Sequence, residues 1–580
     1  MTEEHSGQPS RDDDPFHGVL SIPQDQDYLD DADDHFALAQ EMQEQLNIDQ
    51  RRGFDEILEA IDSGEGKAFF IDGPGGTGKS FMYKTLIHTL TASGRKVCVV
   101  ASTGIAATLI DGVTAHKKFG LPLDLAFDST SQIPAQSKEA RDLKDCSLII
   151  WDEATMSHRH ALEVVDRLLR DITGNRSTPF GGKVVVLGGD FRQCLPVVAK
   201  GSPSQQVAAS IKMSPLWCHF KIINLTRNMR SEDPAFADWV LNIGNGIDGL
   251  KVIYNPLEED LVYNEKDLIS HTFGSVINEH TLPNLRKRVI LSPTNDNCAQ
   301  INQIILDSIP GESIIHSSID EAILDASDTT IIPEEFLNTL TPPGMPPHSL
   351  TFKKQAVYIL LRNLNISRGL CNGTRFFVKE WRQHIVICER ILNHQPPPGT
   401  DLTFVLPRID TSPSKSYPFA MKRRQFPCRP AFAMTINKSH GGTFEKIGVD
   451  LTKDVFSHGQ LYVALSRVRR KSNITIFLQH GKTETSNIVW QEVLDKDYLD
   501  QQIRMRNPRP PVSGRHVSSS DNHYVSAPQE ISSSHNIDLD YDQSQPYHSL
   551  FHFEPLHSEV PMEPAWYYTG NGPSLDTDLP

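Results

Sequence analysis

The chain has 580 residues, of which 38% are hydrophobic, and it carries a formal net charge of −17. This length is enough for about three or four packed domains. No stretch approaches the ~20 uninterrupted apolar residues that a membrane-spanning helix needs, which argues against an integral membrane protein.

The negative charge is concentrated at the two ends of the chain. Residues 1–40 contain 11 acidic residues and 1 arginine, and residues 501–580 contain 10 acidic residues and 4 arginines. The residues between the two ends are close to neutral in net charge. Because a neutral domain can carry a basic groove, this charge distribution is compatible with a nucleic-acid partner. The polar composition of both ends predicts disordered tails at 1–40 and 501–580.

The 8 cysteines are scattered singly, without a CxxC pair. This pattern is typical of neither a zinc ribbon nor a disulfide framework and fits a reducing compartment. The acidic N-terminus has neither an apolar signal region nor the arginine-rich composition of a transit peptide. We therefore expect the cytosol or the nucleus, and a mitochondrial location is not supported.

Apolar runs alternate with helix-like stretches along the chain, beginning near residue 68. The first series predicts strands at 68–72, 96–102, 148–153 and 183–190, with helices at 79–90 and 160–172. A second series predicts strands at 288–295, 355–364, 446–451 and 473–479. Such alternation is typical of parallel sheets with crossover helices, so we expect two α/β units in tandem. The β-rich, proline-containing segment 376–430 reads as a small β domain inserted into the second unit.

The strand at 68–72 is followed by GPGGTGKS, which opens a helix. The spacing GxxxxGK[ST] in a strand–loop–helix context predicts a P-loop, in which backbone N–H groups and the helix N-terminus bind phosphate. We expect Lys79 to reach the β- and γ-phosphates of ATP and Ser80 to bind Mg²⁺. The predicted phosphate-binding residues are Gly73, Pro74, Gly75, Gly76, Thr77, Gly78, Lys79 and Ser80.

Two acids, Asp152 and Glu153, end the strand predicted at 148–153. Alone, such a pair more often caps a following helix, but a P-loop upstream favours a catalytic pair. Asp152 is then expected to hold Mg²⁺ through water, and Glu153 to orient and deprotonate the attacking water.

Three further side chains are candidates for contact with the γ-phosphate. Gln193 closes the strand at 183–190 and is either a phosphate sensor or an ordinary loop amide. Arg230 and Arg467 are candidate cations for the same phosphate. Because most isolated arginines are solvated, their residue type alone does not decide between the two readings.

Taken in order, these motifs resemble those of the petite-integration-frequency (Pif-type) DNA helicases of superfamily 1B, in the branch shared with Helitron transposon helicases. The resemblance covers about residues 41–480. Besides the P-loop it rests on LNIDQ (46–50), ASTGIAATLIDGVTAH (101–116), LIIWDEATM (148–156), VVLGGDFRQCLPV (185–197), LTRNMR (225–230), AFAMTINKSHGGT (431–443) and HGQLYVALSRVR (458–469).

The resemblance implies two RecA-like P-loop domains with ATP between them and an SH3-like domain inserted in the second. It implies that Gln50 reads adenine, that Gln193 lies at the edge of the first domain, and that Arg230 and Arg467 are arginine fingers from the second. The implied divisions are domain 1 at 41–225, domain 2 at 226–375 and 431–500, and the insertion at 376–430.

The resemblance also implies a strand-binding surface and a direction of movement. Family members move 5′ to 3′ on single-stranded DNA, gripping it through phosphate contacts and base stacking. The residues placed near DNA or the cleft are Thr114, His116, Asn372, Thr374, Lys438 and Ser439.

Two segments depart from the family pattern. The motif usually written KSQGQT reads KSHGGT here, so His440 and Gly442 replace two glutamines. Residues 352–361 lack the Gly and Pro that the family often has. Because the first motif links the DNA to the ATP cleft, its changes bear on coupling more than on nucleotide binding.

The leading hypothesis is therefore an ATP-dependent 5′–3′ DNA helicase that acts on single strands and duplex junctions. The family's roles imply DNA recombination, repair and telomere or genome maintenance. We expect a nuclear monomer without membrane association, with tails available to protein partners. The alternatives are a DNA-stimulated ATPase or translocase with weak unwinding, and an inactive DNA-binding relic derived from a Helitron.

Overall fold

The computed structural model describes residues 32–495, apart from residues 199, 248, 255–259, 275–284, 286, 324–331, 343, 355, 367, 393–399 and 413–418. The tail expected at 501–580 and most of the one expected at 1–40 lie outside this range. Residues 32–40 belong to helix α1 (Ala32–Glu44), so the expectation of disorder is wrong there. The acids Asp33 and Asp34 lie in the first turn of α1, where negative charge stabilises a helix.

The first sheet has six parallel strands in the order β3-β2-β4-β5-β1-β6. Their bounds are β1 (Ala68–Asp72), β2 (Val97–Ala101), β3 (Val113–Thr114), β4 (Leu148–Asp152), β5 (Val184–Gly189) and β6 (Phe220–Asn224). All four strands predicted from the first series are present. We call this sheet and its helices the first lobe.

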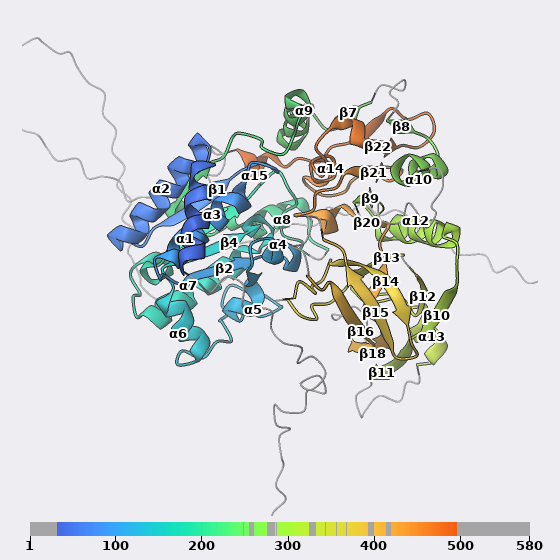
Figure 1. Ribbon diagram of the computed structural model, residues 1–580, viewed down its shortest axis with the longest axis horizontal. Helices are drawn as coiled ribbons and strands as arrows, with labels where there is room; N and C mark the ends of the chain where they lie inside the picture. Colours follow the sequence, from blue (N-terminus) through green and yellow to red (C-terminus); the bar gives the residue numbers. More distant parts are fainter. Residues whose placement is uncertain are drawn as a thin grey trace, which may run out of the picture. The chain divides into compact units, whose positions relative to one another are not determined.

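Helices lie against the two faces of this sheet (Figure 1). They are α2 (Ile48–Ser63), α3 (Lys79–Ala92), α4 (Gly104–Leu109), α5 (Ala115–Phe119), α6 (Lys138–Asp145), α7 (Arg159–Thr173) and α8 (Pro203–Ala209). Successive side chains of a strand point to opposite faces. Phe69 and Ile71 of β1 accordingly join the core beneath α2 and α3. Phe70, between them, joins the core beneath α6 and α7.

The second parallel sheet has the strand order β20-β9-β21-β22-β8. Its strands are β8 (Leu261–Val262), β9 (Arg288–Ser292), β20 (Ala433–Thr435), β21 (Lys446–Asp450) and β22 (Ile474–Phe477). The helices of this part are α9 (Pro234–Asn245), α10 (Glu265–Phe273), α12 (Asn295–Ser308) and α14 (Gln460–Leu465). We call it the second lobe, and a short ribbon of β7 (Lys251–Ile253) and β23 (Glu484–Ser486) belongs to it.

An antiparallel β part interrupts the second lobe, as expected, but it begins earlier than residue 376. Its strands are β10 (Ser313–Ser317), β11 (Ile319–Ile323), β12 (Ser349–Lys353), β13 (Val357–Leu360), β14 (Arg375–Trp381), β15 (Ile385–Arg390), β16 (Thr403–Pro407), β17 (Ile409–Thr411), β18 (Ala420–Gln425) and β19 (Cys428–Pro430), with helix α13 (Glu334–Thr339). We call these residues, 313–430, the inserted part.

The strand predicted at 355–364 was expected in the second parallel sheet, and that placement is wrong. Its residues form β13, which pairs antiparallel with β14 and β19. All four residues of β13 are buried. A short, fully buried apolar run has the same composition in either kind of sheet, so the sequence does not reveal which one it joins. The fold class is nevertheless confirmed: two parallel-sheet units with an antiparallel insertion.

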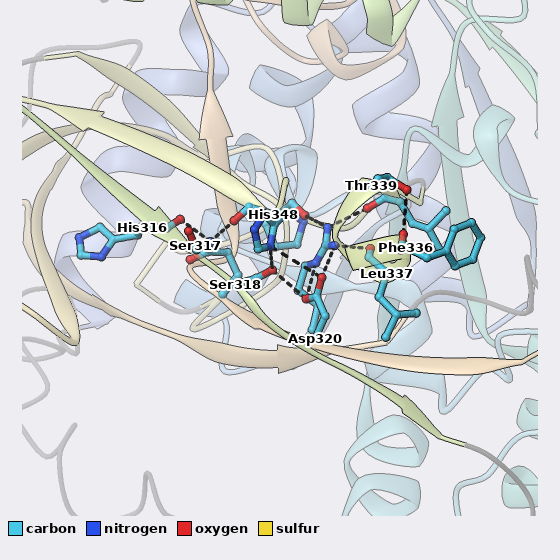
Figure 2. Close-up of polar contacts among 12 residues, drawn as sticks. His316, Ser317, Ser318, Asp320, Phe336, Leu337, Thr339 and His348 are labelled. Carbon is cyan, nitrogen blue, oxygen red and sulfur yellow. Dashed lines mark hydrogen bonds and ion pairs between the residues drawn. The ribbon is translucent and has the colours of Figure 1, made fainter. Parts of the chain in front are cut away.

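A buried ion pair connects the elements of the inserted part (Figure 2). Arg423 on β18 donates from Nε to Asp320 Oδ1 at 2.8 Å and from Nη2 to Oδ2 at 2.5 Å, and both side chains are 0% exposed. The remaining N–H groups reach the carbonyl oxygens of Leu337, Leu340 and Pro346 at 2.9–3.0 Å. One guanidinium therefore holds β11, β18 and α13 together.

The chain returns to the first lobe after β23. Val493 of α15 (Gln491–Leu494) lies in the first lobe's core, and Lys212 Nζ donates to its carbonyl oxygen at 2.6 Å. His458 fixes the approach to α15, since its Nδ1 accepts from the Trp490 N–H at 2.8 Å and its Nε2 donates to the Phe191 carbonyl at 2.7 Å. The two lobes are therefore joined by a C-terminal return as well as by the segment after β6. None of the helices described here is long and apolar enough to cross a membrane.

Candidate functional site

A cavity of about 850 Å³ is lined by residues of both lobes. The first lobe contributes the P-loop and the carboxyl ends of β4 and β5, where ligands of parallel sheets bind. The second lobe contributes the segment after β20 and the end of α14. The cavity brings together most of the predicted nucleotide site: Gly75, Gly76, Thr77, Gly78, Lys79, Ser80, Asp152, Glu153, Gln193, Arg230 and Arg467. Pro74 lines a smaller neighbouring cavity, and Gly73 lines neither.

The P-loop closes on itself through left-handed glycines. Gly76 has φ +95° and Gly78 has φ +84°, a region that residues with a side chain rarely adopt. Thr77 Oγ1 donates to the Pro74 carbonyl at 3.0 Å, and Lys79 Nζ donates to the Gly73 carbonyl. The P-loop and the N-terminal end of α3 thus face the cavity, the arrangement in which backbone N–H groups bind phosphate.

Gln50 lies behind the P-loop instead of in the cavity. Its Nε2 donates to the carbonyl oxygens of Thr77 at 3.1 Å and Gly78 at 3.4 Å. Its Oε1 accepts from the backbone N–H of Asn47, the capping residue of α2. Both ends of the amide therefore support the loop, and the adenine-reading role of Gln50 stays a prediction.

Asp152 and Glu153 face the cavity from the end of β4. Asp152 Oδ1 and Glu153 Oε2 are buried without a hydrogen-bond partner in the described part of the chain. Burial, and next the charge of Glu153, raises the pKa of Asp152 to about 7. Such oxygens, in a cavity that Ser80 also lines, are suitable ligands for a hard cation, so the residues fit the expected Mg²⁺. Glu153 has φ +50°, a conformation that is costly for a non-glycine residue and is concentrated at functional sites.

Gln193 is oriented by the carboxylate of Asp190. Its Nε2 donates to Asp190 Oδ2 at 3.3 Å, which fixes the amide so that Oε1 is the free end. That oxygen is buried and has no partner among the described residues, and Gln193 lines the cavity. This position favours the phosphate or water sensor over the ordinary loop amide.

Arg230 and Arg467 meet above the P-loop. A Cβ built on Gly75 would lie 3.6 Å from Arg467 Nη2 and 3.7 Å from Arg230 Nη1. Burial lowers the pKa of Arg230 to about 10, and burial also lowers the pKa of Arg467. Two desolvated cations at this place are suited to a polyphosphate.

Arg230, which was expected to come from the second lobe, lies on the connection between the two lobes. It follows β6 of the first sheet, and the N–H of neighbouring Met229 donates to the Gly76 carbonyl at 2.8 Å. Arg467 does belong to the second lobe, and the two are connected because Arg230 Nη1 donates to the Ser466 carbonyl at 3.1 Å. The motif lies on the connection between the lobes, so its position in the sequence does not decide to which lobe it attaches.

A second cavity, of about 620 Å³, is lined by Thr374, Lys438 and Ser439 among the predicted strand-contacting residues. Burial, and next the charge of Arg429, lowers the pKa of Lys438 to about 8. Thr114, His116 and Asn372 do not line it, although their neighbours Val113 and Gly373 do. The structure thus brings three of the six predicted residues into one groove, which we call the strand groove.

The segment 438–443 separates the two cavities and contacts Arg467 through its backbone. Arg467 Nη1 donates to the carbonyl oxygens of Ser439 at 3.4 Å and Gly442 at 3.3 Å. Because carbonyl groups make these contacts, the two lost glutamine side chains do not remove them. His440 is buried, and its Nδ1 donates to the Asn437 carbonyl at 2.6 Å.

Two residues with a place in this network, Asp190 and Tyr462, had no predicted role. Both lie within recognised motifs, but the contact between them joins residues 272 positions apart. No local pattern reports such a contact. The only available signal was that each lies in the same motif as a residue that was assigned a role, Gln193 for Asp190 and Arg467 for Tyr462.

The comparisons with known proteins agree with this architecture. Residues 45–250 match the family described as PIF1-like helicase, and residues 335–381 match the DNA helicase Pif1, 2B domain. "ATP-dependent DNA helicase PIF1" of Danio rerio is 27% identical over 464 residues, covering 78% of this chain and 65% of the relative. The protein of that name from Homo sapiens is 27% identical over 425 residues, 71% and 58% of the two chains. This chain spans slightly less than two thirds of the length of these relatives.

Solved structures show the same fold. Pif1 helicase from Candida albicans is 23% identical, with 79% of this chain and 99% of that chain covered and a TM-score of 0.54. Bacteroides Pif1 in complex with ADP-AlF3 and ssDNA is 23% identical, with 78% and 97% covered and a TM-score of 0.55.

The two RecA-like lobes and the cavity between them define a P-loop nucleotide-binding protein. The two family matches occur in the expected order, and the second overlaps β12–β14 of the inserted part. Residues 45–250 and 335–381 are thus similar to the PIF1-like helicases and to their 2B domain.

Proposed function

We propose that the protein is an ATP-dependent DNA helicase that couples ATP hydrolysis to 5′–3′ movement on single-stranded DNA and to duplex unwinding. The observation that carries this proposal is the cavity that unites the P-loop, Asp152 and Glu153 with Arg467 of the other lobe. A site divided between two lobes is completed only when they close on each other. Each hydrolysis cycle is therefore linked to a relative movement of the lobes.

The residues of the cavity have separate tasks in this proposal. The P-loop amides and Lys79 bind the phosphates of ATP, while Ser80 and Asp152 would hold Mg²⁺, which supplies positive charge for the β- and γ-phosphates. Glu153 accepts the proton of the attacking water. Arg230 and Arg467 stabilise the charge that develops on the transferred phosphoryl group.

The proposal is tested with matched partial duplexes that carry either a 5′ or a 3′ single-stranded tail, in ATP and Mg²⁺. We expect opening of the 5′-tailed duplex only, and loss of opening and hydrolysis in Lys79→Ala. Opening of the 3′-tailed duplex would contradict the polarity. DNA-stimulated hydrolysis without opening would favour a translocase, and a wild type that does not hydrolyse ATP would favour the DNA-binding relic.

Binding of single-stranded DNA is expected to weaken as the pH rises from 7 to 9. Lys438 lines the strand groove, and its pKa is lowered to about 8, so the side chain is charged below that pH and neutral above it. Lost positive charge weakens phosphate binding. Fluorescence anisotropy of a labelled oligonucleotide at fixed salt measures the effect.

Lys438→Arg is the matched control, since arginine stays charged over this range. The variant should bind with an affinity that changes less with pH than that of the wild type. An equal pH dependence in both proteins would assign the effect to another group and remove Lys438 from the proposed contact.

Three narrower attributes belong to the same proposal. Membership of the Helitron-related branch is supported by the motif series. Nuclear location belongs to the proposal because the singly placed cysteines fit a reducing compartment. Roles in recombination, repair and telomere or genome maintenance, and action as a monomer at duplex junctions, follow from the family resemblance. The weak-unwinding translocase stays the second candidate because of His440 and Gly442.

A further inference from the structure

Tyr462 reaches from the second lobe to the P-loop of the first. It lies on α14, is 2% exposed, and its ring packs on α9 so closely that a Cβ on Gly244 would lie 2.7 Å from Cδ2. Its hydroxyl donates to Asp190 Oδ2 at 2.7 Å and accepts from the Gly75 N–H at 3.1 Å. One hydroxyl thus joins α14, the end of β5 and the P-loop.

Asp190 connects the Tyr462 hydroxyl to the side chain of Gln193. Its carboxylate is 0% exposed: Oδ1 accepts from the Arg192 backbone N–H at 3.1 Å and from Arg192 Nη1 at 3.2 Å. Oδ2 accepts from both the Tyr462 hydroxyl and Gln193 Nε2. Because a carboxylate accepts and does not donate, Gln193 must present its Nε2 to Asp190, which leaves its Oε1 as the end of the amide that Asp190 does not bind.

The orientation of Gln193 has a chemical consequence. Gln193 lines the cavity, and its Oε1 is a buried acceptor that has no donor among the described residues. Burying an unpaired acceptor costs free energy, so a hydroxyl donor from the cavity satisfies it best. A water molecule placed to attack the γ-phosphate carries such a donor and needs its other proton directed to Glu153.

We propose that Tyr462 is a positioning residue for ATP hydrolysis, which through Asp190 turns the Gln193 carbonyl toward the attacking water and does so only while the second lobe contacts the first. This inference rests on the proposed ATPase function. It adds Tyr462 as the residue that makes the orientation of Gln193 depend on contact between the two lobes. Arg467, which follows the C-terminal end of α14, lines the same cavity as Gln193. Residues on or next to α14 then both stabilise the charge on the γ-phosphate and orient the attacking water.

The test is Tyr462→Phe in the full chain, which removes the hydroxyl and keeps the ring against Gly244. The matched control is Tyr358→Phe in the inserted part. The Tyr358 hydroxyl is also buried, donates to the Thr351 carbonyl at 2.9 Å and accepts from the Lys353 N–H at 3.0 Å. Steady-state hydrolysis with saturating single-stranded DNA gives kcat and KM, and a fluorescent ATP analogue gives nucleotide affinity.

We expect Tyr462→Phe to lower kcat by ~10- to 100-fold, with KM and nucleotide affinity changed by less than about threefold. Tyr358→Phe should stay within about twofold of the wild type in kcat. Since Tyr462 acts through Gln193, Tyr462→Phe combined with Gln193→Ala should be no slower than Gln193→Ala alone.

Four results would overturn the inference. A kcat of Tyr462→Phe within twofold of an active wild type, or multiplying effects in the double variant, would reject the relay and leave the ATPase function standing. A loss confined to nucleotide affinity would reject it in favour of a purely structural role at the P-loop. A wild type that binds the analogue but does not hydrolyse ATP would reject both the relay and the proposed function.

Discussion

Glu153→Gln is expected to lower DNA-stimulated ATP hydrolysis by ~10²- to 10⁴-fold while nucleotide binding is retained. The substitution keeps the shape of the side chain but removes the base, whose Oε2 is buried beside the P-loop without a partner among the described residues. Loss of negative charge next to the phosphates should if anything strengthen binding of ATP. A coupled assay for hydrolysis and a fluorescent ATP analogue for binding measure the two effects separately.

Glu65→Gln is the control for this variant. Glu65 lies on the surface of the same lobe, with a side chain that is 68% exposed, so its neutralisation should leave the rate within about twofold of the wild type. If Glu153→Gln hydrolysed ATP at the wild-type rate, Glu153 would not be the base, and the catalytic reading of the β4 end would have to be abandoned.

Arg423→Met is expected to lower the free energy of unfolding of the inserted part by ~3–5 kcal/mol. The substitution leaves Asp320, 0% exposed, as a buried carboxylate without its partner cation, and three carbonyl oxygens lose their donors. The cost comes from the stranded charge more than from the lost attraction. Hydrogen exchange of the β11 and β18 amides reports the change within the inserted part.

The neighbouring residue provides the control. Arg424 is 60% exposed and faces Asp410 at 3.8 Å, so Arg424→Met should cost less than about 1 kcal/mol. Adding Asp320→Leu to Arg423→Met should recover part of the loss, because it removes the stranded charge. Equal protection of the β11 and β18 amides in Arg423→Met and Arg424→Met would show that the buried pair contributes little.

The parts of the site that were predictable from the sequence are those that depend on local spacing. The P-loop and the Asp152–Glu153 pair each occupy one strand end and the turn after it, so a short window contains the whole signal. The structure places both in one cavity, as parallel strands require. Gln193 was left between two readings, and only the contact with Asp190 distinguishes them.

The parts that were not predictable depend on long-range contacts. The bond from Gly75 to Tyr462 joins residues 387 positions apart, and no composition or period encodes it. The strand β13 was assigned to the wrong sheet because it is buried on both faces, like a strand of a parallel sheet. The helical structure of residues 32–40 was missed because an acidic composition is typical of disordered tails. In α1, however, the acidic residues Asp33 and Asp34 stabilise the first helical turn.

The C-terminal return restricts how the lobes can move. The chain passes from the first lobe to the second after β6 and comes back at Trp490, where Val493 is anchored in the first core. Because the two lobes are joined by two separate chain segments, they can rotate easily about the line through these two connections. Sliding or twisting of one lobe against the other would strain both connections. In the proposed cycle, the movement of the lobes is thereby reduced to a change in a single angle between an open and a closed form. A step of fixed size along a strand is the mechanical result expected of such a restricted joint.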